Sequence, residues 1–177
     1  MIVWLNGTFG AGKTTTSKEL VGLLPDARIF DAEYVGYMLC GGVTGLPALG
    51  DFQHWPPWRR LVVETATQLL EYVGGTLVVP QTVLDEPYWT EISEGLAKAS
   101  VPVHHFVLHA DPATIRHRIE TDPDNADPHG FRMQHVEVYE RSVPWLHAAA
   151  RVVDTTDVAP REVARRIAAG VGVTPAG

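Results

Sequence analysis

Short runs of apolar residues alternate along the chain with longer segments in which apolar residues recur at helical spacing. Short apolar runs are typical of strands buried in a parallel sheet, and the second pattern is typical of amphipathic helices. The pattern predicts strands at 2–5, 28–31, 76–80, 101–108 and 151–155. It predicts helices at 14–24, 34–39, 61–72, 86–99, 112–121, 131–149 (interrupted near Pro144) and 160–169.

This alternation predicts an α/β fold in which a five-stranded parallel sheet carries helices on both faces, joined by right-handed crossovers. The 177 residues are enough to bury a sizeable core, so we expect 1–177 to form a single domain. The apolar content of 45% and the charged content of 20% are those of a globular protein.

A phosphate-binding loop follows the first strand directly. The spacing Gly7-x-x-x-x-Gly12-Lys13-Thr14 is the P-loop pattern, and a helix is predicted immediately after it. Glycines let the backbone approach a polyphosphate, and the free N–H groups of the loop and helix bind the anion. Lys13 is expected to reach the terminal phosphates, and the Thr14 hydroxyl to bind Mg²⁺. The predicted ATP-binding residues are Gly7, Thr8, Phe9, Gly10, Ala11, Gly12, Lys13, Thr14 and Thr15.

Charge and composition restrict the partners. The formal net charge is −7 and no basic cluster is present, which disfavours nucleic-acid binding. The one cysteine, Cys40, excludes an internal disulfide and is expected to be a small buried residue. The first strand begins at Ile2, which leaves no room for a cleavable signal, and no apolar run approaches the roughly 20 residues that span a bilayer. We expect a cytoplasmic protein without a membrane segment, either a monomer or a homodimer.

Two acidic residues follow the second strand, at the edge where parallel α/β sheets bind ligands. Asp31 is the leading candidate to deprotonate an acceptor hydroxyl or to hold Mg²⁺, and the alternative is a helix N-cap. Glu33 is the second candidate. Many P-loop enzymes end the third strand in an aspartate that supports Mg²⁺, but here Gln81 and Thr82 follow the strand. Both could bind substrate or a metal-bound water, and neither replaces a carboxylate.

Arginines flank a polar segment rich in proline and glycine, at about 121–135, which is expected to form a lid over the site. Phosphoryl transfer requires positive charge near the phosphates, and arginine supplies it. Arg118, Arg132 and Arg141 are therefore catalytic candidates, and Arg118 could also stack on a nucleotide base. The alternative is ordinary solvated charge on helices. The eight histidines show no metal-binding spacing.

Segment 34–72 is predicted to bind the acceptor, because it contains a long irregular stretch at 43–57 and combines aromatic with polar residues. The alternative is that its tryptophans anchor the loop to the core. The candidate substrate contacts, together with those above, are Asp31, Glu33, Tyr37, Asp51, Gln53, Trp58, Arg59, Gln81 and Thr82.

Four stretches resemble the tunicamycin-resistance (TmrB-like) proteins: the P-loop, Asp31–Leu39, Asp51-Phe52-Gln53 with Trp58-Arg59, and Val79–Val83. The resemblance implies a P-loop NTPase of the nucleoside-kinase type, a three-layer sandwich with a lid, which binds ATP and a small acceptor such as a uridine-containing antibiotic. It also implies that Arg118 is the adenine-stacking arginine and that Arg132 and Arg141 are lid arginines. A second arginine that often follows the stacking one is replaced here by Asp122.

Three functions remain open from the sequence. The first is an ATP- and Mg²⁺-dependent kinase that phosphorylates a hydroxyl of a small molecule, such as an antibiotic. The second is a protein that sequesters the antibiotic in an ATP-dependent manner without chemistry. The third is a nucleoside monophosphate kinase, for which Arg59 and Arg60 are the only evident ligands of an acceptor phosphate.

Overall fold

The computed structural model describes residues 1–123 and 130–172 and contains a parallel sheet with the strand order β2-β3-β1-β4-β5. The strands are β1 (Ile2–Asn6), β2 (Ala27–Ile29), β3 (Thr76–Pro80), β4 (Val103–His109) and β5 (Arg151–Asp154). The helices are α1 (Lys13–Val21), α2 (Glu33–Gly42), the 3₁₀ turn η1 (Phe52–His54), α3 (Pro56–Val73), α4 (Glu86–Lys98), α5 (Pro112–Glu120), α6 (Phe131–Ala149) and α7 (Pro160–Gly170). The predicted α/β class and five-stranded parallel sheet are confirmed.

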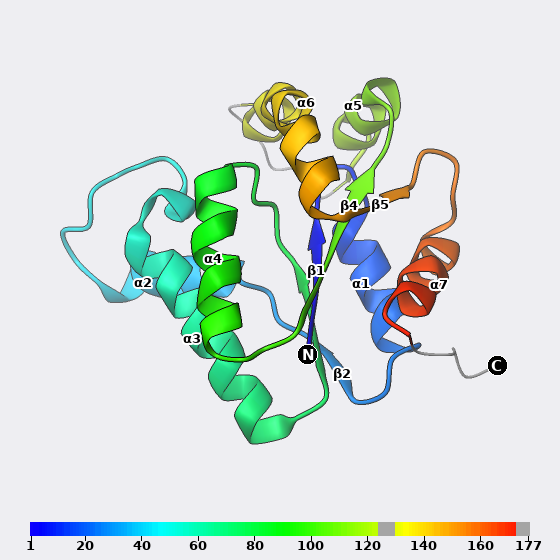
Figure 1. Ribbon diagram of the computed structural model, residues 1–177. Helices are drawn as coiled ribbons and strands as arrows, with labels where there is room; N and C mark the ends of the chain where they lie inside the picture. Colours follow the sequence, from blue (N-terminus) through cyan, green and yellow to red (C-terminus); the bar gives the residue numbers. More distant parts are fainter. Residues whose placement is uncertain (124–129, 173–177) are drawn as a thin grey trace.

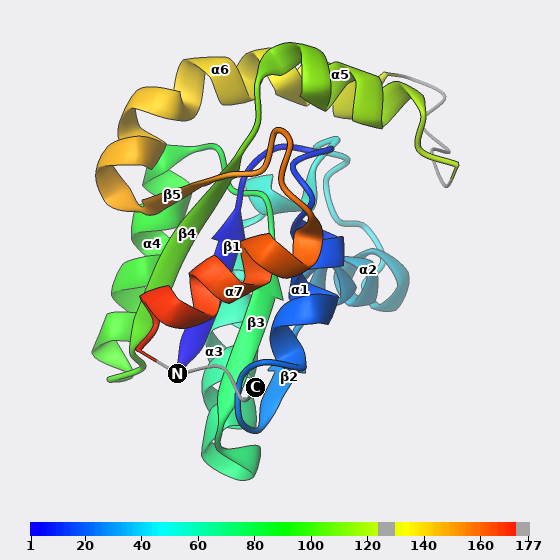
Figure 2. The ribbon, with the colours of Figure 1, turned by 90° about the vertical axis from the view of Figure 1, so that its right-hand side faces the viewer.

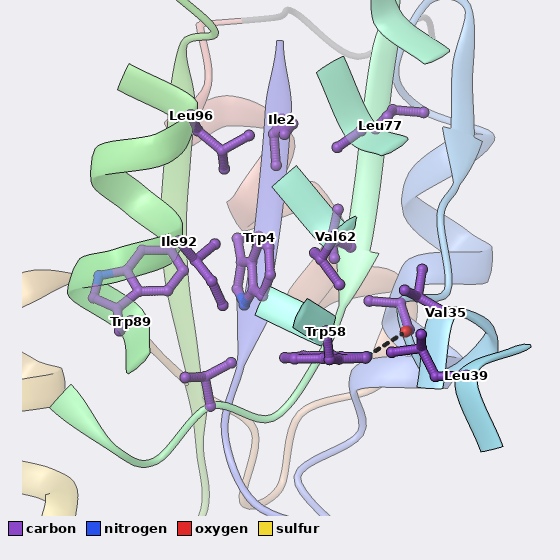
Figure 3. Packing of buried hydrophobic residues seen from close by; sticks show 14 residues of the cluster. Ile2, Trp4, Val35, Leu39, Trp58, Val62, Leu77, Trp89, Ile92 and Leu96 are labelled. Carbon is purple, nitrogen blue, oxygen red and sulfur yellow. Dashed lines mark hydrogen bonds between the residues drawn. The ribbon is translucent and has the colours of Figure 1, made fainter. Parts of the chain in front are cut away.

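Both faces of the sheet are covered, which explains why the strands are apolar throughout (Figure 1). In β1, Ile2 and Trp4 point toward the α3 and α4 side, where they pack with Val62 and Ile92 (Figure 3). Val3 belongs to the opposite layer, which is closed by α1 and α7. The alternation of side chains along a strand therefore divides one continuous apolar run between two cores.

The carboxyl ends of the strands form the edge at which the predicted site lies. Helices α5 and α6 extend across this edge, as the rotated view in Figure 2 shows. They bury a third apolar cluster that includes Val107, Ile115 and Tyr139. The P-loop lies beneath them, between β1 and α1. The site is therefore bounded by the sheet edge on one side and by this helical layer on the other.

Some predicted boundaries are wrong. Helix α3 begins at Pro56 instead of at 61, because Pro56 and Pro57 occupy a first turn in which backbone N–H groups have no helical partner. Helix α6 continues through Pro144 without an interruption, since one missing hydrogen bond does not outweigh the packing of Tyr139 and Leu146 beneath it. Cys40 is exposed instead of buried.

None of the helices within 1–123 and 130–172 is long and apolar enough to cross a membrane.

Candidate active site

The P-loop begins at a buried polar residue that ends β1. Asn6 is fully buried, and its side-chain oxygen accepts hydrogen bonds from the N–H groups of Gly7 and Val83 at 2.8 and 2.9 Å. Its amide nitrogen donates to the Val83 carbonyl at 2.8 Å. The Thr82 hydroxyl donates to the Gly7 carbonyl at 2.9 Å. The first residue of the loop is thus fixed to the segment that follows β3.

Glycine is required at two positions of the loop. Gly7 has a φ of +129°, and a Cβ there would lie 2.5 Å from the Leu108 carbonyl oxygen. Gly10 has a φ of +73°, and a Cβ there would lie 2.9 Å from the Ile115 carbonyl oxygen. A side chain at either position would push the loop away from β4 or α5. The glycine spacing that identifies the motif is therefore also what allows the loop to pack.

Lys13 folds back over the loop. Its ammonium group donates to the carbonyls of Gly7 and Thr8 at 2.9 and 2.8 Å. Burial lowers the pKa of Lys13 to about 7, while nearby Glu33 opposes this shift and nearby Arg132 adds to it. An anion in the loop would favour the charged ammonium form. Binding of a polyphosphate at this place would therefore be coupled to protonation of the lysine.

A cavity of about 650 Å³ opens beside the loop. Its walls include the predicted phosphate contacts from Phe9 to Thr15, together with Glu33, Thr82, Arg118 and Arg132. Helix α1 begins at Lys13, so its unpaired N–H groups and its positive dipole end lie at this cavity. Thr14 is exposed. These features fit a nucleoside triphosphate. The cavity is also lined by four residues that the sequence alone did not indicate, Thr155, Val158, Pro160 and Val163.

The residues that line the cavity also fit a magnesium ion that is bound mainly through phosphate and water oxygens. The exposed Thr14 hydroxyl and the Glu33 carboxylate both line the cavity. Across the described part of the chain, no three His, Cys, Asp or Glu side chains gather closely enough to hold a metal ion by themselves. Magnesium with one or two protein oxygens and several phosphate and water oxygens requires no such cluster.

The two acidic candidates occupy different positions. The Asp31 carboxylate accepts a hydrogen bond at 3.0 Å from the N–H of Glu33, the first residue of α2, so it contacts the start of the helix, although Ala32 and not Asp31 is the N-cap residue. Asp31 is absent from the described walls of the cavity, whereas Glu33 lines it and interacts electrostatically with Lys13. Tyr37 donates its hydroxyl to Glu33 at 3.1 Å across one turn of α2 and is otherwise exposed. The geometry therefore favours Glu33 over Asp31 as the acid that faces the phosphates.

The three arginines also differ. Arg118 donates to the carbonyls of Thr155 and Thr156 at 2.7 and 2.9 Å and to that of Gly10 at 3.3 Å, so its guanidinium is fixed in the cavity wall. This arrangement suits contact with a base better than movement toward phosphates. Arg132 lines the cavity and pairs with Asp122 at 2.7 Å.

Arg141 lies elsewhere. It is exposed on α6, nine residues beyond Arg132 and so about 13 Å further along an unbroken helix, and it lines none of the cavities described for residues 1–123 and 130–172. The structure does not bring it to the site. The predicted lid at 121–135 lies partly outside the described residues, at 124–129, and its last part forms the start of α6.

Two smaller pockets, of about 80 and 190 Å³, continue the main cavity. The smaller one shares Phe9, Glu33 and Thr82 with the main cavity, and the two small pockets share Asp51, Gln53, Thr82 and His135. We call the two together the acceptor groove. Its remaining described walls are Gly50, Phe52, His54, Gln81, Leu84, Asp85, Tyr88, Phe131 and Val138. The predicted contacts Asp51, Gln53, Gln81 and Thr82 are therefore brought together.

The predicted contacts Trp58 and Arg59 lie in the protein interior instead. Trp58 is fully buried and donates its indole N–H to the Ala32 carbonyl at 3.1 Å (Figure 3). Arg59 is 7% exposed, binds Glu91 at 2.5 Å and donates to the Gln53 carbonyl. Because α3 begins at Pro56, both residues lie in its first turn and face inward. The alternative that this segment is anchored by its tryptophan fits Trp58.

Known proteins resemble this chain in sequence and in fold. The profile of the family described as AAA domain matches residues 2–143. The tunicamycin resistance protein of Deinococcus radiodurans superposes with a TM-score of 0.80 at 27% identity, over 99% of this chain and 98% of that one. This likeness confirms the resemblance that the sequence motifs indicate.

Two kinases share the fold at lower identity. A sugar kinase from Janibacter gives a TM-score of 0.71 at 16% identity, with 98% of this chain and 95% of that chain covered. The APS kinase of Mycobacterium tuberculosis, in complex with AMPPNP and APS, gives a TM-score of 0.61 at 16% identity, with 97% of this chain and 96% of that chain covered. No curated protein sequence matches the chain. The profile match spans most of the chain and includes the P-loop, and the chain therefore belongs to the AAA domain family, with the P-loop kinase-like fold.

Proposed function

We propose that this protein is an ATP-dependent phosphotransferase that acts on a hydroxyl of a small molecule, such as a nucleoside antibiotic of the kind named for the Deinococcus relative. The observation that carries the proposal is the continuity of two sites. The cavity at the P-loop and the acceptor groove share Phe9, Glu33 and Thr82, and Lys13 lies beside this junction. A hydroxyl bound in the groove would thus lie next to phosphates bound at the P-loop.

In the proposed reaction, the acceptor oxygen forms a bond to the γ-phosphorus while the bond between that phosphorus and the β,γ-bridging oxygen breaks, so that ADP leaves. Glu33 accepts the hydroxyl proton, and Asp31 holds the first turn of α2 through the Glu33 N–H. Lys13 and the loop amides bind the phosphates, and Arg132 adds positive charge beside them. Magnesium, held through Thr14 and phosphate oxygens, would neutralise charge on the phosphates.

The test is mass spectrometry of tunicamycin, nucleosides and amino sugars after incubation with the protein and Mg-ATP. We expect one compound to gain a single phosphoryl group, and Lys13→Ala to abolish this gain. Glu33→Gln should lower the rate by about 10²–10⁴-fold, the usual contribution of a general base, and Asp31→Asn should lower it less. If Glu33→Gln keeps full activity while Asp31→Asn loses it, the assignment of the base reverts to Asp31.

A second function, sequestration without chemistry, is favoured by the end of β3. Gln81 and Thr82 stand there, Gln81 is 3% exposed, and the Thr82 hydroxyl is committed to Gly7. A carboxylate that supports magnesium is therefore lacking at that place. ATP-dependent binding of tunicamycin at one molecule per protein, with no phosphorylated product over many hours, would support sequestration and refute the kinase.

The position of the arginines weighs against a nucleoside monophosphate kinase. Arg59 is buried against Glu91, and the Arg60 side chain is 80% exposed and lies 3.7 Å from the same carboxylate. Neither arginine is among the described residues that line the acceptor groove. Phosphorylation of a nucleoside monophosphate in preference to the nucleoside would contradict this conclusion.

A further inference from the structure

The charge of the cavity changes between its two ends. Lys13, Arg118 and Arg132 line the part at the P-loop. By contrast, the described walls of the acceptor groove contain neither lysine nor arginine, and they carry the carboxylates of Glu33, Asp51 and Asp85. A ligand that spans both parts meets positive charge at its phosphates and negative charge at its other end.

The cations around the groove do not reverse this sign. Lys13 and Arg132 lie at the P-loop end, 5.6 and 5.7 Å from the centre of the Phe9 ring. Arg59 lies behind the groove, with its guanidinium 4.1 Å from the centre of the Tyr88 ring. It is already bound to the Glu91 carboxylate and to the Gln53 carbonyl. The two histidines of the groove are also engaged: His54 contacts the Tyr88 hydroxyl at 3.0 Å, and His135 donates to the Phe131 carbonyl at 2.8 Å. Among the described residues, no guanidinium or ammonium group is offered to an acceptor here.

An independent feature points to a ligand with hydrogen-bond donors. Gln81 lines the smaller pocket and is 3% exposed. Its amide nitrogen donates to the Thr82 carbonyl at 3.2 Å, which fixes the amide orientation because two carbonyl oxygens would repel each other. Its side-chain oxygen is buried without a partner among the described residues. A buried acceptor without a donor is unfavourable, and a hydroxyl or amine of a ligand would satisfy it.

We propose that the acceptor groove binds a neutral or positively charged hydroxyl compound through its donor groups and excludes anionic acceptors such as phosphate monoesters and carboxylated sugars. This inference rests on the proposed function, in which the phosphoryl acceptor occupies the groove. An anion that enters the groove loses its hydration and gains three like charges in return. A neutral polyol or an amino sugar instead donates to the carboxylates and to the Gln81 oxygen.

The test separates binding from chemistry. Calorimetry on the wild-type protein saturated with Mg-AMPPNP measures the binding of two matched sets of compounds. The first set is glucosamine, glucose and glucuronate, and the second is cytidine, uridine and uridine monophosphate. We expect the anionic member of each set to bind at least about tenfold more weakly than the neutral one, as a unit charge at ion-pair distance near a protein surface predicts. Equal or tighter binding of the anions would overturn the inference, as would failure of all neutral and cationic probes to bind at millimolar concentration.

Charge variants test the cause. Asp51→Asn and Asp85→Asn retain a side-chain oxygen, so they keep the caps that these residues form on η1 and α4. Each should reduce the discrimination against anions by about threefold or more. Glu94→Gln is the matched control, because Glu94 is an exposed residue of α4 that lines neither pocket, and it should leave the discrimination unchanged. An equal effect of all three variants would assign the selectivity to net charge and overturn the role of the groove.

A transfer assay on the same probes keeps the two proposals apart. If neutral probes bind with the expected preference but no phosphoryl group is transferred from Mg-ATP, the phosphotransferase proposal fails and the charge selectivity of the groove stands. If anionic probes are phosphorylated as fast as neutral ones, the phosphotransferase stands and the inference about the groove fails.

Discussion

The environment of Lys13 predicts that nucleotide binding takes up a proton. In the free protein, burial lowers the pKa of Lys13 to about 7. Phosphate groups in the loop would favour the charged ammonium and raise this pKa toward the ordinary lysine range. Near pH 8, about 0.9 of the Lys13 side chains are neutral before binding and become charged after it, so about 0.9 proton is taken up per nucleotide. Near pH 6 the uptake falls to about 0.1, because the side chain is already charged.

Isothermal titration calorimetry with Mg-ATP, without an acceptor, measures this uptake near pH 8 when it is repeated in two phosphate-free buffers of different ionisation enthalpy, such as HEPES and Tris. The affinity should also fall by up to about tenfold per pH unit above pH 7, since the neutral form is the one that must bind a proton. Lys13→Ala should remove the uptake. Lys18→Ala should not, because Lys18 is exposed on the same helix and does not line the cavity.

An uptake near pH 8 that is close to zero, or that persists in Lys13→Ala, would refute this reasoning.

The lowered pKa of Lys13 also predicts how the stability of the free protein depends on pH. The folded state has the lower pKa, so the unfolded chain binds more protons between about pH 7 and the ordinary lysine pKa. The unfolding free energy should therefore rise with pH in this window, and less so in Lys13→Ala.

Three further predictions concern stability and are measured by denaturant unfolding. Arg59→Met removes the partner of the partly exposed Glu91 carboxylate and the donor to the Gln53 carbonyl, so it should cost about 1–3 kcal/mol. Arg60→Met removes only an exposed contact and should change stability by less than about 0.5 kcal/mol; equal effects of the two variants would contradict the structural role of Arg59. Trp58→Ala empties a fully buried site and should cost about 3–5 kcal/mol, and a stable variant with weakened acceptor binding would instead restore its predicted substrate role. Asn6→Ala removes four side-chain hydrogen bonds, three to Gly7 and Val83 and one to His105, so it should cost about 1–3 kcal/mol and weaken ATP binding; unchanged ATP affinity would show that the loop holds its shape without them.

The acidic residues show where a sequence pattern stops being informative. Asp31 and Glu33 are two positions apart at the same edge of the sheet, and both are common helix-start residues. Which of them reaches the P-loop depends on where α2 begins and how that helix is rotated about its axis. Because α2 begins at Glu33 with Ala32 as its N-cap, Asp31 lies before the helix and accepts a hydrogen bond from the Glu33 N–H, whereas the Glu33 side chain interacts electrostatically with Lys13.

The acceptor segment shows the same limit over a longer range. Asp51 and Gln53 lie in the acceptor groove, whereas Trp58 and Arg59, a few residues further on, lie in the interior. The Pro56-Pro57 pair is a local signal for an earlier start of α3. An earlier start places Trp58 and Arg59 in the first turn of that helix. No local signal shows that this first turn packs against Ala32 and Glu91, which are distant in the sequence.

The sequence by itself determined the fold class, the alternation of strands and helices, and the phosphate-binding loop. Each of these follows from residues that are neighbours along the chain: apolar runs that fit a sheet covered on both faces, and glycines spaced to admit a polyphosphate. Only the tertiary structure decided that Glu33 and not Asp31 lines the cavity at the P-loop, that Arg141 lies away from that cavity, and that the walls of the acceptor groove are acidic. These features depend on helix rotation and on contacts between distant segments, which form only when the whole chain packs.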